Sequence, residues 1–211
     1  MCIRDSKTLR GDLTKFRSIQ DITEDVDILY HLATAKKEKR TYASMKKLLY
    51  INTQGTENLL RACYRSNSLK KIILVSSSAV YGDPGYSPIP ENTPLKPKNF
   101  YGASKAAAEM VAHAYRNTYS LPIVIARPST IFGPRQKPPN VIPQMIHDGL
   151  KFGLIRISDP EATRDFIYIN DIVEGLILMG ITSGIEGETF NLGSGSETSL
   201  HNLAKIISKY L

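Results

Sequence analysis

The sequence KKIILVSSSAVYG, residues 70–82, decides the fold class of this chain of 211 residues. Its first half is a run of apolar, largely β-branched residues without polar alternation, which is typical of a strand covered on both faces. Three serines follow directly, so hydroxyl groups stand where the strand ends. Such a strand predicts a parallel sheet with helices on both sides.

Strand and helix patterns alternate around this stretch. VDILYHLAT at residues 26–34 and IVIARP at residues 123–128 predict two further buried strands, and apolar spacings predict helices over about residues 42–64 and 102–119. Residues 133–171 are rich in proline, glycine and charge, with a short helix expected near residues 141–150, a strand at 188–192 and a helix at 199–210. We therefore expect a doubly wound α/β fold with a parallel sheet and additional elements near the C-terminus.

Composition and charge exclude several classes of protein. Apolar residues make up 42% and charged residues 22%, which excludes a disordered tail, a fibre and a disulfide scaffold. The net charge of +7 suits an anionic ligand without choosing between nucleic acid, phospholipid and a diphosphate metabolite. The basic run KKEKR at residues 36–40 is interpreted as a solvated loop or helix start, and no nucleic-acid motif accompanies it.

Cysteine use and hydropathy bear on location. The two cysteines, Cys2 and Cys63, form no CxxC and no metal-ligand spacing, which favours a reducing compartment. No apolar run approaches ~18 residues, and the start MCIRDS has no signal-peptide pattern. We expect a cytoplasmic protein that binds neither membrane nor metal.

The motif YGASK at residues 101–105 carries the chemistry. A spacing of four places Tyr101 and Lys105 on one face of the predicted helix. A nearby ammonium favours the phenolate, so the motif predicts a lowered pKa for Tyr101 and a base that works near neutral pH. The serines at 76–78 end a parallel strand, where ligands of such sheets bind, and a hydroxyl there can hold a substrate oxygen beside that base.

These motifs resemble the extended short-chain dehydrogenases/reductases, in particular the NAD-dependent nucleotide-sugar epimerase/dehydratase branch. Eight elements occur in the family's order: GDL, HLAT, INTQGT, VSSSAVYG, YGASK, ARPSTIFGPRQ, TRDFIYINDIV and FNLGSG. The resemblance spans residues 11–195. It implies a partial NAD-binding, Rossmann-like domain over residues 1–132. Over residues 133–211 it implies a partial substrate-binding region, interleaved with the last strand and helix of the sheet domain.

The resemblance also implies the roles of individual residues. Ser77 corresponds to the catalytic Ser or Thr, Tyr101 to the base, and Lys105 to the residue that binds the nicotinamide ribose. Contacts with NAD are implied for Asp12, Leu13, Leu32, Ala33, Thr34, Asn52, Ser76, Tyr101, Lys105, Pro128 and Ser129. Contacts with a nucleoside-diphosphate sugar are implied for Ser77, Ser78, Thr130, Asn140 and Arg164, the last on the diphosphate.

The sequence departs from the family pattern in three respects. No GxxGxxG occurs, although the family opens with this loop to hold the pyrophosphate at a helix N-terminus. We therefore expect a fragment that lacks the first strands of the sheet and is inactive by itself. Ser78 and Ala79 stand where dehydratases carry an Asp-Glu pair, which disfavours dehydration. Thr130 replaces an Asn found in many relatives.

The resemblance implies an NAD-dependent 4-epimerase of the UDP-glucose 4-epimerase type, acting as a homodimer through the helix that carries YGASK. A dehydratase or an NAD(P)-dependent carbonyl reductase of the same family stays open, as does a non-catalytic binding subunit. Several residues have purely structural alternatives. Asp12 could cap a helix, Asn52 could bind backbone, Arg164 could pair with Asp165 on the surface, and His31 is expected to be a packed strand residue.

Overall fold

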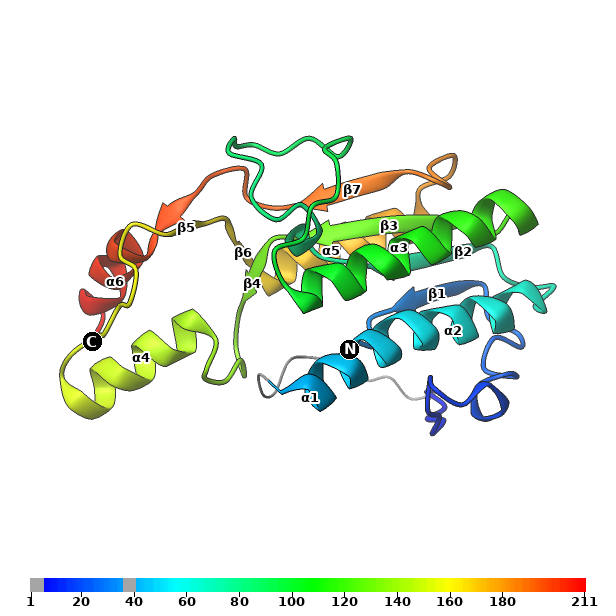
Figure 1. Cartoon of the computed structure of the whole chain (residues 1–211), viewed down its shortest axis with the longest axis horizontal. Helices are drawn as coiled ribbons and strands as arrows, with labels where there is room; N and C mark the ends of the chain where they lie inside the picture. Colours follow the sequence, from blue (N-terminus) through cyan, green and yellow to red (C-terminus); the bar gives the residue numbers. More distant parts are fainter. Residues whose placement is uncertain (1–5, 36–40) are drawn as a thin grey trace.

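The computed structural model describes residues 6–35 and 41–211 (Figure 1). The interpretations of the KKEKR run at residues 36–40 and of most of the N-terminal MCIRDS therefore lie outside the described residues. A four-stranded parallel sheet has the order β1 (Ile28–His31), β2 (Lys71–Val75), β3 (Ile123–Pro128) and β7 (Thr189–Leu192). The expected parallel sheet is thus confirmed, with β1 at one edge among the described residues.

Both faces of the sheet are covered, which explains the unbroken apolar runs. On one face, Ile72, Leu74, Ile123 and Ile125 pack against the helices α2 (Gly55–Tyr64) and α3 (Phe100–Tyr119). On the other face, the alternate residues of the same strands pack against α5 (Ile169–Ile181). In Figure 1, α2 and α3 lie in front of the sheet and α5 lies behind it.

The helix expected over residues 42–64 is present, with an interruption. It consists of α1 (Tyr42–Leu49), a π-helical turn η2 (Tyr50–Gln54) and α2. The helix expected over residues 102–119 begins slightly earlier, at Phe100, because Asn99 accepts a hydrogen bond from the Gly102 N–H and caps it. The helix α5 was not predicted from the sequence.

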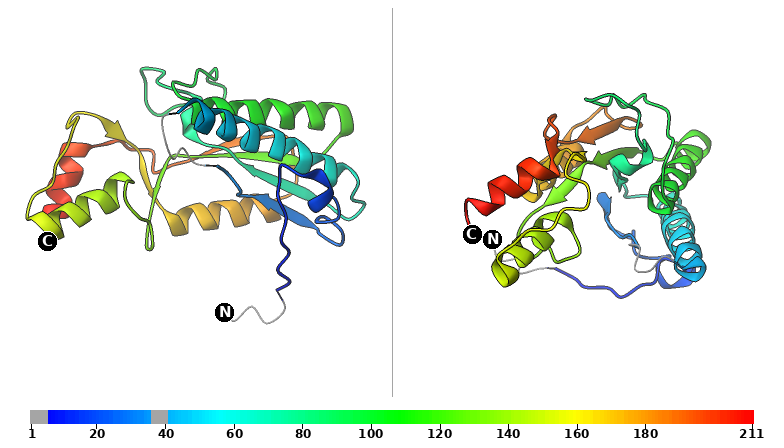
Figure 2. Two further views of the ribbon diagram at one scale, coloured as in Figure 1. Left: turned by 60° about the horizontal axis from the view of Figure 1, so that its bottom comes forward. Right: turned by 60° about the vertical axis from the view of Figure 1, so that its left-hand side comes forward.

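The C-terminal elements form a second group with its own apolar core (Figure 2). Helices α4 (Val141–Phe152) and α6 (Leu200–Ser208) pack on each other there, close to the ranges predicted for them. Two small sheets complete the group and join it to the large sheet: β4 (Thr130–Phe132) with β6 (Phe166–Tyr168), and β5 (Thr163–Arg164) with β8 (Thr198–Ser199).

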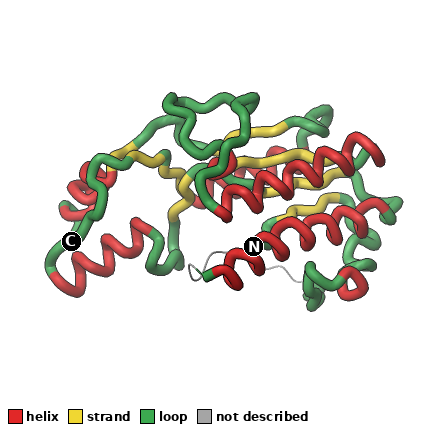
Figure 3. Tube along the Cα trace, in the orientation of Figure 1, coloured by secondary structure: helices red, strands yellow, loops and turns green. Residues whose placement is uncertain are grey.

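Two loops bear on the functional site. Figure 3 shows them in green: residues 6–27, interrupted by the 3-10 turn η1 (Phe16–Ser18), and residues 82–99, which follow the 3-10 turn η3 (Ser78–Val80). Of the helices in the described residues, none combines the length and apolarity needed to cross a membrane.

Candidate active site

The predicted catalytic residues meet at the carboxyl edge of the parallel sheet. Ser77 lies just beyond β2, and Tyr101 and Lys105 lie in the first two turns of α3. Gly102 makes this approach possible, because a Cβ there would collide with the carbonyl oxygen of Ala79 in η3. The first turn of α3 therefore packs directly on the turn that Ser77 caps.

Ser77 and Tyr101 are neighbours in this arrangement. The Ser77 Oγ accepts a hydrogen bond from the Ala79 N–H at 3.2 Å, which fixes the turn. Burial raises the pKa of Tyr101 above its ordinary value, and a hydrogen bond with Ser77 offsets part of this rise. Both side chains are half-buried, so one face of each stays open to a ligand.

The prediction that Lys105 lowers the pKa of Tyr101 is wrong for this structure. The Lys105 Nζ donates to the carbonyl oxygen of Val75 at 2.9 Å, at the end of β2, and burial of the phenol dominates. Burial also lowers the pKa of Lys105 to about 8, although the carboxylate of Glu109 opposes this change. Lys105 therefore remains mainly protonated at neutral pH, with N–H groups to spare beyond the one on Val75.

Asn52 joins two parts of the site. It lies in the π-helical turn η2, and such turns are frequent at functional sites. Its Oδ1 accepts from the Ala35 N–H at 2.7 Å and from the Thr34 hydroxyl at 3.2 Å. Its Nδ2 donates to the Ala35 carbonyl oxygen at 3.2 Å and to the Ser104 Oγ at 2.9 Å. The loop after β1 is thereby fixed to α3, next to Lys105.

His31 packs beneath this loop, and its prediction as a packed strand residue is confirmed. It is 5% exposed, and its Nε2 lies 2.9 Å from the Thr56 Oγ1. The Thr56 hydroxyl donates to the carbonyl oxygen of Asn52 at 2.7 Å, so His31 carries its proton on Nε2. Burial and the Lys105 charge lower the pKa of His31 to about 4.

The N-terminal residues assigned to NAD lie against α2. The Leu13 carbonyl oxygen accepts from the Asn58 Nδ2 at 2.7 Å, and the Asp12 Oδ1 accepts from the N–H and hydroxyl of Thr14. The structural alternative for Asp12, a helix cap, is wrong, because the next helical turn, η1, begins after Lys15 and the Asp12 carboxylate binds Thr14 instead. Leu32, Ala33 and Thr34 are exposed at the end of β1, where an apolar side chain such as Leu32 has open space in front of it.

Two buried hydroxyls at the same edge have no hydrogen-bond partner in the described part of the chain. They belong to Ser76, 3% exposed, and to Ser129, which follows the neighbouring strand β3 and Pro128. Buried polar groups in native proteins are nearly always paired, so two such groups on adjacent strands call for a polar ligand. This observation fits a cofactor with hydroxyl and amide groups, as predicted for NAD.

The residues assigned to the substrate lie on the C-terminal group. The Thr130 N–H donates to the Asp165 carbonyl oxygen at 2.9 Å, which places Thr130 beside Arg164, and both lie near the sheet edge. Asn140 precedes α4 and its Nδ2 donates to the Lys137 carbonyl oxygen, away from the other predicted residues. The alternative of an Arg164–Asp165 ion pair is wrong, because Asp165 accepts from the Ser194 N–H and hydroxyl instead.

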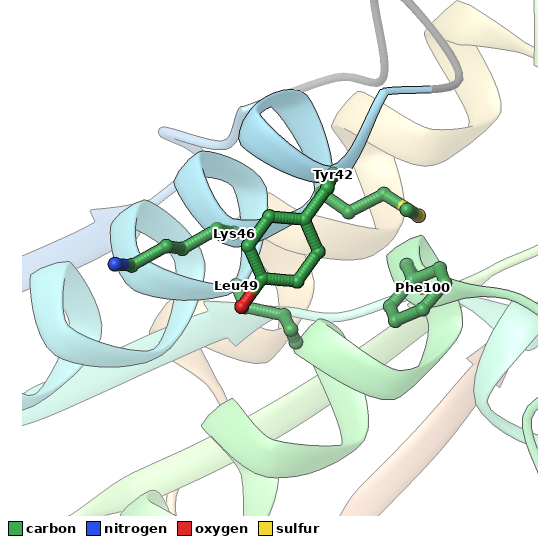
Figure 4. Close-up of a pocket in the computed structure, with 5 residues that line it drawn as sticks. Tyr42, Lys46, Leu49 and Phe100 are labelled. Carbon is green, nitrogen blue, oxygen red and sulfur yellow. The ribbon is translucent and has the colours of Figure 1, made fainter.

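A shallow apolar hollow of about 160 Å³ lies between α1 and the start of α3 and is lined by Tyr42, Met45, Lys46, Leu49 and Phe100 (Figure 4). Across residues 6–35 and 41–211, no three His, Cys, Asp or Glu side chains are grouped as metal ligands.

Known proteins share both sequence and structure with this chain. The human dTDP-D-glucose 4,6-dehydratase is 34% identical over 205 residues, which cover 94% of this chain and 57% of that enzyme. The UDP-glucuronic acid 4-epimerase of Bacillus cereus, solved with UDP-glucuronic acid and NAD, matches with a TM-score of 0.83 and 30% identity, over 95% of this chain and 62% of that one.

A second solved structure points the same way. The dTDP-glucose 4,6-dehydratase DesIV of Streptomyces venezuelae, solved with NAD, matches with a TM-score of 0.86 and 28% identity, over 98% of this chain and 65% of that one. The chain thus spans about three fifths of the length of these relatives. The family model described as "NAD dependent epimerase/dehydratase family" matches residues 2–193, so this chain belongs to that family.

Proposed function

We propose that the whole protein is an NAD-dependent 4-epimerase of a nucleoside-diphosphate sugar. One observation carries this proposal: Ser77 and Tyr101 are neighbours at the carboxyl edge of the sheet, beside the hydroxyls of Ser76 and Ser129, which have no hydrogen-bond partner within residues 6–35 and 41–211. NAD would supply the chemistry of accepting a hydride from the sugar and returning it. The residues assigned above would hold it, with Lys105 on the ribose.

Each catalytic residue then has one task. Tyr101 takes the proton of the sugar hydroxyl, and Ser77 holds the same oxygen while it becomes a carbonyl. In this chain burial raises the pKa of Tyr101 and the Lys105 ammonium donates to the Val75 carbonyl oxygen, so we propose that Lys105 favours the phenolate only once substrate and cofactor are bound. NAD would supply the hydride for the opposite face of the sugar, and Tyr101 would give its proton back to the same oxygen.

The turn after Ser77 favours epimerisation over dehydration. Ser78 and Ala79 begin η3, and neither can remove a proton or protonate a leaving hydroxyl as a carboxyl pair does. The similarity to two dehydratases keeps elimination of water as the second candidate. Ser78, Thr130, Asn140 and Arg164 are proposed to contact the sugar nucleotide.

Product analysis decides between these reactions. We would extend the chain by the residues encoded upstream of it in the gene and incubate it with NAD and UDP-hexoses or UDP-hexuronates. NMR should show interconversion of 4-epimers while the absorbance of NADH stays constant, and Tyr101→Phe should slow this interconversion by about 10²–10⁴-fold. Loss of water from the sugar would favour the dehydratase, stoichiometric use of cofactor the reductase, and turnover that survives Tyr101→Phe would refute the assigned base.

Two finer points belong to the same proposal. We propose that further strands pair with β1 in the whole protein, on the side where no strand within residues 6–35 and 41–211 pairs with it, and that residues 1–132 and 133–211 serve NAD and substrate respectively. We also propose that these 211 residues alone bind NAD weakly and are inactive, because the sequence holds no glycine-rich loop for the pyrophosphate. A cytoplasmic location stays a prediction.

We further propose a homodimer through the outer face of α1 and α3. Ala108 and Ala112 of α3 pack inside the subunit and do not form part of that face. Large exposed side chains line the outer face instead, among them Tyr42, Phe100 and Met110 around the hollow of Figure 4 and along α3. Aromatic residues and Met are enriched at interfaces. Light scattering should give a dimer at micromolar concentration and a monomer for Phe100→Ser with Met110→Lys; a wild-type monomer would contradict this.

A further inference from the structure

A buried ion pair lies next to the helix that carries Tyr101 and Lys105, and neither of its residues has been assigned to the cofactor or the substrate. Arg127 of β3 is 5% exposed and Glu109 of α3 is 0% exposed. The Arg127 Nη2 donates to the Glu109 Oε2 at 2.6 Å, and its Nε donates to Oε1 at 3.0 Å. The remaining donor group of the guanidinium, Nη1, binds the Tyr81 hydroxyl at 2.7 Å and the Glu91 carbonyl oxygen at 2.9 Å.

The contacts continue into β7 and the loop of residues 82–99. The Tyr81 hydroxyl donates to the Asn191 Oδ1 at 2.8 Å, and the Asn191 Nδ2 donates to the Ile89 carbonyl oxygen at 2.7 Å. The Asn191 N–H donates to the Glu91 Oε1 at 3.0 Å. We call Arg127, Glu109, Tyr81, Asn191 and Glu91 the Arg127 cluster.

The Arg127 cluster joins the two elements that carry the reacting hydroxyls. Tyr81 directly follows η3, the turn that begins after Ser77. Glu109 is one helical turn beyond Lys105 and two turns beyond Tyr101. One guanidinium therefore holds the Ser77 turn through Tyr81 and the catalytic helix through Glu109.

Stability alone does not account for such a pair. Two charges lose their hydration when they are buried, and replacing both by apolar residues of similar size is often neutral or stabilising. The geometry of a planar guanidinium with directed N–H groups, by contrast, fixes the relative positions of the groups it binds. A charge pair at this place is thus better suited to setting a distance than to adding stability.

We propose that Arg127 is a positioning residue that sets the spacing between the Ser77 hydroxyl and the Tyr101 phenol by holding Tyr81 and Glu109 together. Its importance for turnover rests on the proposed function. The spacing itself does not, and it can be measured without any reaction.

The test uses three sets of variants of the 211-residue chain. Arg127→Met with Glu109→Leu removes the ion pair without leaving a single buried charge. Tyr81→Phe removes only the hydroxyl that Arg127 binds, and it provides the test of the positioning role if the double variant does not fold. Lys71→Met with Glu186→Leu is the matched control, because this ion pair of 2.8 Å, with a buried lysine, lies at the opposite end of β2.

The readout is the 13Cζ NMR signal of Tyr101, assigned by its loss in Tyr101→Phe. We expect this signal to move in Arg127→Met/Glu109→Leu and in Tyr81→Phe, in the direction seen for Ser77→Ala. Adding Ser77→Ala to these variants should produce no further change. The control should leave the signal in place. An unmoved Tyr101 signal in the folded variants, or an equal movement in the control, would overturn the proposal.

Kinetics of the upstream-extended chain separate this proposal from the proposed function. If both hold, the Arg127 variants should lose about 10²-fold in kcat with little change in KM, as expected for misplaced reacting groups. A Tyr101 signal that moves while the wild type has no turnover would leave the positioning intact and refute the proposed function. Turnover by the wild type together with an unmoved Tyr101 signal in the variants would support the proposed function and refute the positioning role of Arg127.

Discussion

His31 should make the stability of the folded chain depend on pH in a range where few groups titrate. The ring is buried, donates from Nε2 to Thr56 and faces the ammonium of Lys105. Its pKa of about 4 in the folded chain lies below 6.5, the value in the unfolded chain. The unfolded chain therefore takes up the proton first as the pH falls, so stability is complete above pH 6.5 and is lost between pH 6.5 and 4.

The size of the effect follows from the two pKa values. The difference between 6.5 and 4 corresponds to about 3 kcal/mol of unfolding free energy once the pH is below 4, and to about 2 kcal/mol between pH 7 and pH 5. That is a large part of the stability of an ordinary domain. His31→Gln should remove this dependence, because Gln keeps an N–H donor for Thr56 and does not titrate.

Urea unfolding followed by circular dichroism measures this pH dependence of the unfolding free energy, since the chain has no Trp for fluorescence. Unfolding curves are recorded at pH 5, 6, 7 and 8 for the wild type and for His31→Gln. The two proteins share all other titratable groups, so the contribution of those groups cancels in the difference between their unfolding free energies. The wild type should lose about 2 kcal/mol more than the variant between pH 7 and 5. Parallel pH profiles of the two proteins would refute the reasoning.

Three further predictions concern the geometry of the site. Gly102→Ala should lower the unfolding free energy by about 1–3 kcal/mol, because the added Cβ collides with η3. The matched helical change Gly175→Ala meets only a flexible leucine side chain and should leave the unfolding free energy equal or raise it, and chemical denaturation compares the two variants. Asn52→Ala should cost about 2–3 kcal/mol, because it leaves the Ala35 N–H without its acceptor and removes the amide that donates to the Ser104 Oγ. The exposed Asn117→Ala on α3 serves as the control, and an equal loss in both variants would contradict the assignment. Tyr101→Phe in the upstream-extended chain should reduce kcat by about 10²–10⁴-fold without preventing NAD binding, as steady-state kinetics and calorimetry would show.

The sheet was predictable because its strands carry a strong signal. Alternate residues at positions 72–75 of β2 and 123–126 of β3 enter two different apolar cores, so these positions are all apolar and the runs cannot be confused with surface strands. The catalytic residues were predictable for a related reason. They lie where a strand ends and where a helix begins, and short sequence motifs are typical of such positions.

Other features left weaker marks in the sequence. Helix α5 is apolar around most of its circumference, so no helical period of apolar residues appears in its sequence. It also contains two glycines, Gly175 and Gly180, and Gly180 is needed because the Tyr30 side chain packs closely on it. The π-helical turn at Asn52 has no sequence pattern of its own. The Arg127 cluster joins residues far apart in the chain, although an arginine inside the apolar run IVIARP is a sign that a buried acid must pair with it.

The pKa of Tyr101 could not be read from spacing. The motif fixes which helix face carries Tyr101 and Lys105, but not where the lysine ammonium points. In the fold the end of β2 offers it the carbonyl of Val75, and burial then decides the pKa of the phenol. Local spacing predicts proximity, whereas electrostatics depends on the packing around it.

Calorimetric titration with NAD tests the central claim most directly, namely that the carboxyl edge of β1, β2 and β3 is a cofactor site. The upstream-extended chain should bind NAD with micromolar affinity or better. Ser76→Ala and Ser129→Ala should each weaken binding by about three- to tenfold, because each removes one hydrogen bond to the ligand. The 211-residue chain should show no saturable binding at micromolar concentration. Absence of binding by the extended chain, or an affinity indifferent to both serines, would contradict the claim, and micromolar binding by the 211 residues alone would show that the glycine-rich loop is dispensable.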